Sequence, residues 1–266
     1  MYNLVNPVNN VSIDLHTDGA VGIVTINRPE KKNAMLLAMR DALAEVCEKI
    51  NDTPEIRAVV LTGAGSDFCS GADIGEMGMG GLNGSFLRAR HMHKVIRAIA
   101  RLQKPVVCAT RGVAVGMGFS MALASDIIIA SETTRFAQIQ KKIALPPDAG
   151  GAWFLARQLG MAKAKDLTFS ARMVGAAEAL QFGLVLKVVP DAALMDEALA
   201  LARDYASGPT IALGLAKRMF DVAPSLTLDE FMDLEASMLP LAVQAQDFKE
   251  GTQAFKDKRA ASFTGH

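Results

Sequence analysis

The chain has 266 residues, half of them hydrophobic, which is enough to bury a large core in one domain with a smaller appendage. Its 28 basic and 28 acidic residues cancel and only 6% of residues are aromatic, so neither nucleic acid nor an anionic membrane is indicated as a partner. Three widely spaced cysteines and four scattered histidines indicate neither a disulfide framework nor a metal site.

The N-terminal residues 1–10 contain no basic segment followed by an apolar one, so we expect no secretory signal peptide. No part of the sequence approaches the ~20 uninterrupted apolar residues of a membrane-spanning helix. The odd number of separated cysteines fits a reducing compartment. We therefore expect a cytoplasmic protein.

The first half of the chain predicts strands that alternate with helices. Two alternating runs, 11–16 and 21–27, flank Asp18-Gly19 and predict a β-hairpin. Apolar residues at three- and four-residue steps predict an amphipathic helix over 36–50. The elements expected next are a strand at 58–61, a glycine-rich loop from 62 to about 84, a helix marked by apolar residues over 92–102, and a strand at 106–109.

The second half changes from this alternation to mostly helices. A helix-like run at 119–124 precedes a strand at 126–130, and a short strand at 185–189 interrupts the helices that begin near residue 161. Strand–helix alternation with short connections predicts an α/β fold with parallel strands. We expect three or four helices after residue 192, which divides the chain into an α/β core, 1–191, and a helical C-terminal region, 192–266.

A glycine-rich turn lies between two of these elements. The predicted strand before it breaks at Gly112, Gly116 and Gly118, and a helix follows. Backbone N–H groups at such a helix start lack partners and carry the positive end of the helix dipole. Without side chains in the way, a phosphate or the oxyanion of a transition state could approach them. A close-packed turn with no ligand is the alternative interpretation.

Three common glycine or serine motifs are not met. The nearest dinucleotide-binding match, 63–68, has Phe68 where glycine or alanine is required and no helix directly after it. The sequence contains no Gly-Lys-Ser/Thr for a P-loop. Ser70 and Ser120 lie in no Gly-x-Ser-x-Gly frame, which excludes the nucleophile elbow of hydrolases.

Two loops of small residues remain, 68–74 (FCSGADI) and 116–120 (GMGFS), and each follows a predicted strand. With them, the chain resembles the crotonase family, also called the enoyl-CoA hydratase/isomerase family, over nearly its whole length. The segments that carry the resemblance are 27–34 (NRPEKKNA), 61–74, 104–127, 147–151, 178–189 and 250–259. Their order and spacing together make the resemblance specific.

This resemblance implies a crotonase-like spiral of ββα units with a helical C-terminal trimerisation region. It also implies an acyl-CoA thioester as substrate, a homotrimer or a dimer of trimers, and no cofactor beyond the coenzyme A of the substrate. By position, the backbone N–H groups of Ala72 and Met117 would hold the thioester oxygen as it becomes an enolate. The residues expected near coenzyme A are Lys32, Ser70, Gly71, Ala72, Asp73, Ile74 and Lys258, the last one reaching a neighbouring subunit.

Two features weaken the expected coenzyme A contacts. Each of Lys32 and Lys258 could equally be a solvated surface charge. Family hydratases often have a lysine after the Gly-Ala-Asp-Ile segment, and here that residue is Gly75.

The two glutamates that family hydratases use to add water are missing. Their positions are occupied by Ser120 and Gln140, and neither side chain is a general base near neutral pH. Hydration by the two-glutamate route is therefore not expected.

A carboxylate stands elsewhere, where hydratases usually have glycine. Asp148 follows Pro146-Pro147 and precedes a flexible Ala-Gly-Gly. On spacing alone it could be the N-cap of the helix that starts near Gly151. In the family context it resembles the aspartate of Δ3-Δ2-enoyl-CoA isomerases and of the ring-epoxide isomerase of phenylacetate breakdown. We expect Asp148 to be the single proton shuttle of an enoyl-CoA isomerase.

Three alternatives stay open. One is an enoyl-CoA hydratase with an atypical site. Another is an aryl-CoA dehalogenase, in which Asp148 would be the nucleophile and His93 the base, although those enzymes carry an aromatic residue at the position of Gln140. The third is a non-catalytic acyl-CoA-binding homologue. The segment 75–84, with Met77, Met79 and Leu82, is expected to line the acyl end.

Overall fold

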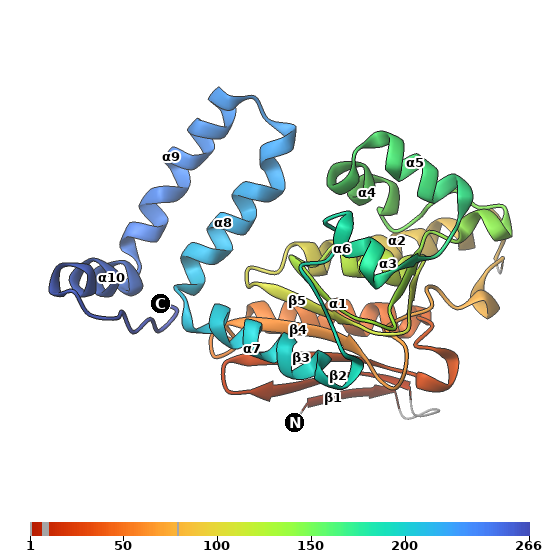
Figure 1. Ribbon diagram of the computed structural model, residues 1–266, viewed down its shortest axis with the longest axis horizontal. Coiled ribbons are helices and arrows are strands. Elements are labelled where there is room, and N and C mark those ends of the chain that lie inside the picture. The colour runs from red at the N-terminus through yellow and green to blue at the C-terminus, as the bar shows by residue number, and fades with distance from the viewer. Residues whose placement is uncertain (1, 7–10, 79) are drawn as a thin grey trace.

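The computed structural model describes residues 2–6, 11–78 and 80–266, and Figure 1 shows their arrangement. Seven strands form the main sheet in the order β1-β2-β3-β4-β5-β7-β10. They are β1 (Tyr2–Asn6), β2 (Val11–Asp18), β3 (Val21–Asn27), β4 (Ala58–Gly63), β5 (Val106–Thr110), β7 (Ile127–Ser131) and β10 (Lys187–Val189). The first three strands run antiparallel, and the pairs from β3 onwards are parallel.

A second, three-stranded sheet and ten helices complete the fold of the described residues. The small sheet contains β6 (Val113–Val115), β8 (Arg135–Ala137) and β9 (Val174–Gly175). The helices are α1 (Leu37–Asn51), α2 (Gly81–Ala100), α3 (Met117–Leu123), α4 (Gly151–Leu159), α5 (Met161–Ser170), α6 (Ala176–Gln181), α7 (Leu194–Ser207), α8 (Thr210–Val222), α9 (Leu228–Gln244) and α10 (Gln246–Asp257).

Both faces of the central strands are buried, which explains their uninterrupted apolar sequences. Because side chains alternate along a strand, Val59 and Leu61 of β4 join the core under α1 and α2, and Val60 joins the core under α7. The buried face of α7 carries Ala198, Ala202 and Ala206 at four-residue steps, so this helix can approach the sheet closely.

The predicted hairpin, the helix over 36–50 and the strands near 58, 106, 126 and 185 are confirmed within a few residues. Two expectations were wrong. The glycine-rich loop is shorter than predicted, because α2 already begins at Gly81, where glycines and an exposed apolar stretch hide the helical period. The strands β6, β8 and β9 were missed because two or three residues are too few to show alternation.

The C-terminal helices form two different arrangements. Although α7 was predicted as part of the helical C-terminal region, it packs on the main sheet, whereas α8, α9 and α10 project away from it (Figure 1). Lys217 of α8 forms an ion pair with Asp126 at 2.9 Å, and Arg57 donates hydrogen bonds to Thr210 and to the main-chain oxygens of Gly208 and Phe263. These contacts fasten the projecting helices to the core.

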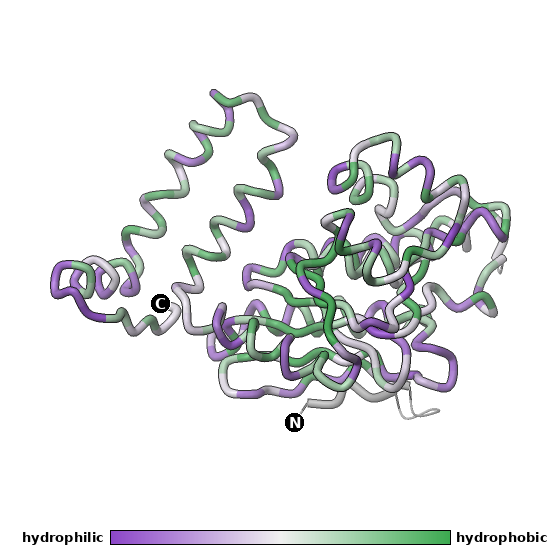
Figure 2. The backbone as a smooth tube through the Cα atoms, in the orientation of Figure 1, coloured by the Kyte–Doolittle hydropathy of each residue, from purple (hydrophilic) through white to green (hydrophobic). Residues whose placement is uncertain are grey.

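No helix of the described residues is both long and apolar enough to cross a membrane. Instead, hydrophobic and hydrophilic residues alternate along α8 and α9 (Figure 2), as expected for amphipathic helices with one face to cover.

Candidate active site

The segment 68–73 runs extended between two partners, which fixes its backbone. On one side Cys69 donates to Val113 of β6 at 2.9 Å and accepts from Val115 at 3.0 Å. On the other side Met35 donates to Gly71 at 2.8 Å and accepts from the N–H of Asp73 at 3.1 Å. The segment therefore behaves like a short strand inserted between β6 and the start of the α1 region.

The first turn of α3 packs directly onto this segment at Gly118. A Cβ atom at Gly118 would lie 2.2 Å from the carbonyl oxygen of Cys69, so no other residue fits without displacing the backbone. Gly116, which precedes the helix, has φ +55°, a conformation that favours glycine. The two glycines bring the two predicted loops into contact.

At this contact two backbone N–H groups have no hydrogen-bond partner within the part of the chain that the structure describes. Ala72 pairs with Met35 in a parallel β-bridge, in which the hydrogen bonds are made by Gly71 and Asp73 on either side of Ala72. The N–H of Ala72 therefore points away from Met35. The N–H of Met117 belongs to the first turn of α3 and has no acceptor within that helix. Gly71 directly precedes Ala72, and a Cβ atom at Gly71 would lie 3.6 Å from the nitrogen of Met117. The N–H groups of Ala72 and Met117 are therefore close together.

Asp148 lies half-buried in the segment between the 3₁₀ turn η3 (Gln140–Ile143) and α4. Its Oδ1 accepts a hydrogen bond from Nε2 of Gln140 at 2.8 Å. Its main-chain oxygen accepts from Gly151 at 2.8 Å and from the Ser120 hydroxyl at 3.4 Å. The carboxylate does not cap α4, whose N-cap residue is Gly150. The helix-cap interpretation is therefore wrong.

Gln140 links this carboxylate to the start of α3. A Cβ atom at Gly116 would lie 3.7 Å from Nε2 of Gln140, the same atom that donates to Asp148. Gly116 directly precedes Met117. The structure thus brings together Ala72, Met117 and Asp148, with Ser120 and Gln140 beside Asp148.

Arg40 is a buried cation behind this site that sequence reasoning missed. Its side chain is 2% exposed, donates to the main-chain oxygen of Met35 at 2.9 Å, and lies 3.9 Å from the carboxylate of Glu76. Burial lowers the pKa of Arg40, and the opposing charges of Glu76 and Asp148 raise it. The signal was present in the sequence, because Arg40 falls four residues after Leu36 on the apolar stripe of α1.

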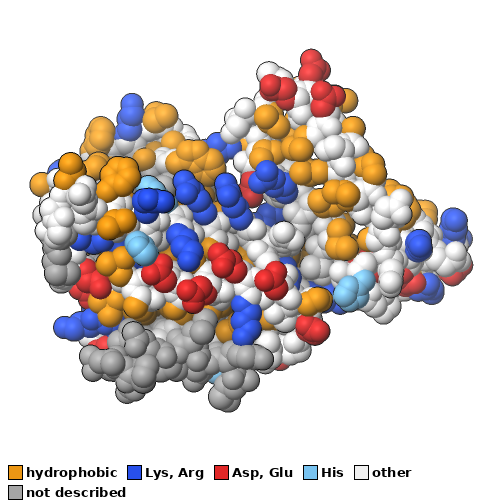
Figure 3. Space-filling model, turned by 180° about the vertical axis from the view of Figure 1, so that it is seen from behind, with side chains coloured by type: hydrophobic (Ala, Val, Ile, Leu, Met, Phe, Trp, Pro, Cys, Tyr) orange, Lys and Arg blue, Asp and Glu red, His pale blue; other side chains and the backbone are white. Residues whose placement is uncertain are grey.

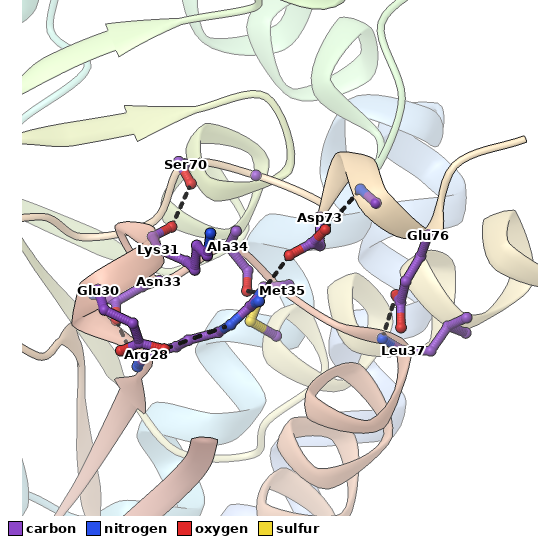
Figure 4. Close-up of polar contacts among 12 residues, drawn as sticks. Arg28, Glu30, Lys31, Asn33, Ala34, Met35, Leu37, Ser70, Asp73 and Glu76 are labelled. Atoms are coloured by element: carbon purple, nitrogen blue, oxygen red, sulfur yellow. Dashed lines mark hydrogen bonds and ion pairs between the residues drawn. The ribbon is translucent and has the colours of Figure 1, made fainter. Parts of the chain in front are cut away.

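The segments 28–37 and 70–76 pack side by side (Figure 4). Arg28 donates to the carboxylate of Asp73 and to the main-chain oxygen of Ala34. This hydrogen bond from Arg28 lowers the pKa of Asp73. The other oxygen of Asp73 accepts from Gly75 at 2.7 Å, so this carboxylate is occupied by structural contacts.

The expected coenzyme A residues separate into two groups. Lys32 lies beside Ser70, whose N–H donates to the main-chain oxygen of Lys32 at 2.9 Å, and Ile74 is 69% exposed next to them. Lys258 ends α10, at the opposite end of the molecule from the 70–76 segment (Figure 1). Within one chain these two lysines do not meet.

Two further side chains complete the surroundings. The thiol of Cys69 is fully buried beside the N–H of Gly71, 3.3 Å away, and burial raises its pKa to about 12. His93 is exposed on α2 and forms no hydrogen bond or ion pair with any described residue. Met79, expected near the acyl end, lies outside the described residues. Across the described chain, no three His, Cys, Asp or Glu side chains gather as metal ligands would.

Comparisons with known proteins identify the family of the chain. The enoyl-CoA hydratase/isomerase family model matches residues 16–266. The 1,2-epoxyphenylacetyl-CoA isomerase of Escherichia coli K12 is 37% identical over 94% of this chain and 97% of its own. A probable enoyl-CoA hydratase of Rhodobacter capsulatus is 39% identical over 92% of this chain and 95% of its own.

Solved structures show the same fold. The crystal structure of an enoyl-CoA hydratase from Bacillus anthracis superposes with a TM-score of 0.91 at 32% identity, covering 97% of this chain and all of the other. With the matched family model, these findings establish the fold and the family. The chain has the crotonase fold and belongs to the enoyl-CoA hydratase/isomerase family of acyl-CoA enzymes.

Proposed function

We propose that the protein is a Δ3-Δ2-enoyl-CoA isomerase in which Asp148 is the single proton shuttle. The proposal rests on one observation: Gln140 connects the carboxylate of Asp148 to the start of α3, where two backbone N–H groups have no partner among the described residues. Asp73 and Glu76 also lie near these loops, but Asp73 is bound by Arg28 and Gly75, and Glu76 accepts from the N–H of Leu37 at 2.8 Å. Among the described residues, Oδ2 of Asp148 has no hydrogen-bond partner, so this oxygen is available for a proton.

In the proposed mechanism the thioester oxygen lies between the N–H groups of Ala72 and Met117. These donors stabilise negative charge on that oxygen and make the proton on C2 acidic. Asp148 takes this proton from a 3-enoyl-CoA, and the electron pair becomes a dienolate. The double bond moves from C3–C4 to C2–C3 when the same carboxyl returns the proton to C4. One group suffices, because the proton taken is the proton returned.

The surroundings of Asp148 support a shuttle more than a hydratase. Ser120 and Gln140 occupy the two positions at which family hydratases carry glutamate, and neither can accept a proton near neutral pH. The relative from Escherichia coli is named for an isomerisation of a CoA thioester. The relative from Rhodobacter capsulatus is named a probable hydratase, so hydration through Asp148 is the second candidate.

The substrate would be bound by the 70–76 segment, and the protein would act as a homotrimer or a dimer of trimers. Lys32, Ser70, Gly71, Ala72, Asp73 and Ile74 would contact coenzyme A, with Lys258 supplied by a neighbouring subunit. The projecting helices carry exposed apolar side chains (Figure 3), which a second subunit could cover. They include Phe220, Leu228, Met232 and Phe255, which are 80%, 72%, 56% and 86% exposed. Sedimentation equilibrium would measure the number of subunits.

Replacing Asp148 by Asn tests the assignment. The amide cannot accept the proton from C2, so kcat with 3-enoyl-CoA should fall by roughly 10²–10⁴ with little change in KM. Exchange of the C2 proton with deuterated buffer should be lost as well. Unchanged turnover would exclude Asp148 as the base.

The same assays separate the alternatives. Wild-type protein that hydrates 2-enoyl-CoA faster than it isomerises 3-enoyl-CoA would favour the hydratase. Chloride release from a chlorinated aryl-CoA, reduced by His93→Ala, would favour the dehalogenase. Binding of acyl-CoA without any exchange of the C2 proton would identify a non-catalytic homologue.

A further inference from the structure

We infer that Gln140 is the positioning residue of Asp148. Family hydratases carry glutamate at the positions of Ser120 and Gln140. In this chain the residues at those two positions hold the single carboxylate in place. This inference rests on the proposed function, because it assigns how the proposed shuttle is oriented. Gln140 touches the carboxylate and not the reacting carbons, and is therefore not itself a catalytic residue.

The contact is direct and partly buried. Gln140 is 5% exposed and its Nε2 lies 2.8 Å from Oδ1 of Asp148. A carboxylate turns about its terminal bond with little preference, so one fixed oxygen determines where the other points. With Oδ1 engaged, Oδ2 is left as the proton acceptor. Nε2 of Gln140 lies 3.7 Å from where a Cβ atom at Gly116 would be, so the contact stands next to the start of α3.

The orientation of the amide supports this role. Oε1 of Gln140 is buried and has no hydrogen-bond partner among the described residues, which is unfavourable for a polar atom. Turning the amide over would face Oε1 towards the carboxylate oxygen, and two acceptors would repel each other. The chain thus keeps an unpartnered oxygen in order to present an N–H to Asp148.

A second chain of contacts holds the backbone of the same residue. Gln138, 1% exposed, donates from Nε2 to the hydroxyl of Ser120 at 3.4 Å, and Ser120 donates to the main-chain oxygen of Asp148 at 3.4 Å. The amide of Gln138 fills the space that a side chain at Gly151 would need. Gln140 therefore fixes the carboxylate, and Ser120 with Gln138 supports the turn that carries it.

This arrangement also explains why glutamate is absent from position 140. A glutamate there would put a second carboxyl against Oδ1 of Asp148, and two carboxyls at that distance share a proton. Arg40, a charged group that faces Asp148 from α1, already lies 3.9 Å from the carboxylate of Glu76. Asp148 and Gln140 therefore form a matched pair.

The test compares three variants of the full-length protein with 3-enoyl-CoA as substrate. Gln140→Leu removes the donor, and Gln140→Glu keeps the shape but adds the second carboxyl. Gln158→Leu is the control, because Gln158 is an exposed glutamine of α4 whose amide donates to the main-chain oxygen of Leu123, away from Asp148. Each protein is measured for kcat, KM, the pH profile of kcat and the melting temperature.

We expect Gln140→Leu to lower kcat by roughly 10²-fold with KM within about twofold, since misplacing a catalytic group costs about that much. In Gln140→Glu the acidic limb of the kcat profile should move to higher pH, because the shared proton must leave before Asp148 can act. Gln158→Leu should match the wild type. Both effects should occur without a loss of folded protein.

Two results would overturn the inference. One is a kcat within about twofold of wild type in Gln140→Leu. The other is an unshifted pH profile of kcat in Gln140→Glu. This second measurement still decides the question if Gln140→Leu does not fold. Either result, combined with an inactive Asp148→Asn, would leave the proposed function standing. An active Asp148→Asn would instead remove the proposed function itself.

Discussion

The two halves of the candidate site are built from different parts of the chain. The proposed oxyanion half would use backbone N–H groups of Ala72 and Met117, whose loops are held by main-chain hydrogen bonds and by the absence of a side chain at Gly118. The proposed proton-transfer half would use side chains, with Asp148 held by Gln140 and by Ser120. We expect the first half to accept changes of residue type wherever the backbone stays in place, and the second half not to accept them.

This difference indicates how one fold can host several reactions. An enolate oxygen is stabilised by backbone donors at fixed positions, and in this chain the two loops that would supply them touch only because residue 118 is glycine. The group that moves the proton can be carried at another position, provided that its neighbours change with it. Here, the carboxylate at 148 and the amide at 140 occur together.

The largest effect in the backbone half is expected from Gly118→Ala. Its Cβ would meet the Cys69 oxygen at 2.2 Å and push the two loops apart. Because one oxyanion donor contributes about 10²–10³ in rate, kcat with 3-enoyl-CoA should fall by roughly 10²-fold or more, and the melting temperature should fall too.

Gly175→Ala is the matched control for that change. Gly175 has φ −75°, and the nearest atom to its Cβ position is a guanidinium nitrogen of Arg135 at 3.9 Å. This variant should keep wild-type kcat. If Gly118→Ala also kept wild-type kcat, the two loops would not form a rigid pair.

A smaller effect is expected from Arg40→Met, which tests whether the proton-transfer half depends on charge behind it. Methionine fills a similar space but removes a buried cation that acts on Asp148. We expect kcat to fall about tenfold with KM nearly constant. Arg40→Lys, which keeps the charge, should retain more activity than Arg40→Met, and equal losses in the two variants would assign Arg40 a purely structural role.

The smallest effect is expected from Ala72→Ser. The donor at this position is the main chain, and the side chain is only half-buried, so a hydroxyl should be accommodated. We expect kcat/KM to stay within about threefold of wild type, since the substitution adds one small atom and leaves the backbone donor in place. A loss above about tenfold would show that side-chain identity matters in the backbone half as well.

The sequence predicted the backbone half of the site more completely than the proton-transfer half. Glycine spacing and small residues indicated both loops of the backbone half, because a close backbone approach restricts residue type locally. Asp148 was singled out by the family resemblance, because spacing alone also fitted a helix cap. Its contact with Gln140 was not predicted, because seven residues of 3₁₀ turn and proline-rich loop lie between the two, and no periodic rule relates them.

Burial was harder to predict for polar residues than for apolar ones. Arg40 lies on the apolar stripe of its helix, yet an arginine is normally expected at the surface. Gln138 and Gln140 are buried in a segment whose strand, β8, is too short to reveal which side chains face inwards. In each case the tertiary neighbours decide, and a single sequence does not contain them.

The buried thiol of Cys69 offers a way to observe the backbone half directly. Only a thiolate reacts readily with alkylating reagents, and burial raises the pKa of both Cys69 and Cys47 to about 12. Cys108 is likewise fully buried. The native enzyme should therefore resist thiol reagents and mild oxidants. The rate at which Cys69 is alkylated, measured separately from the other cysteines by mass spectrometry, would then report how often the 68–74 loop opens.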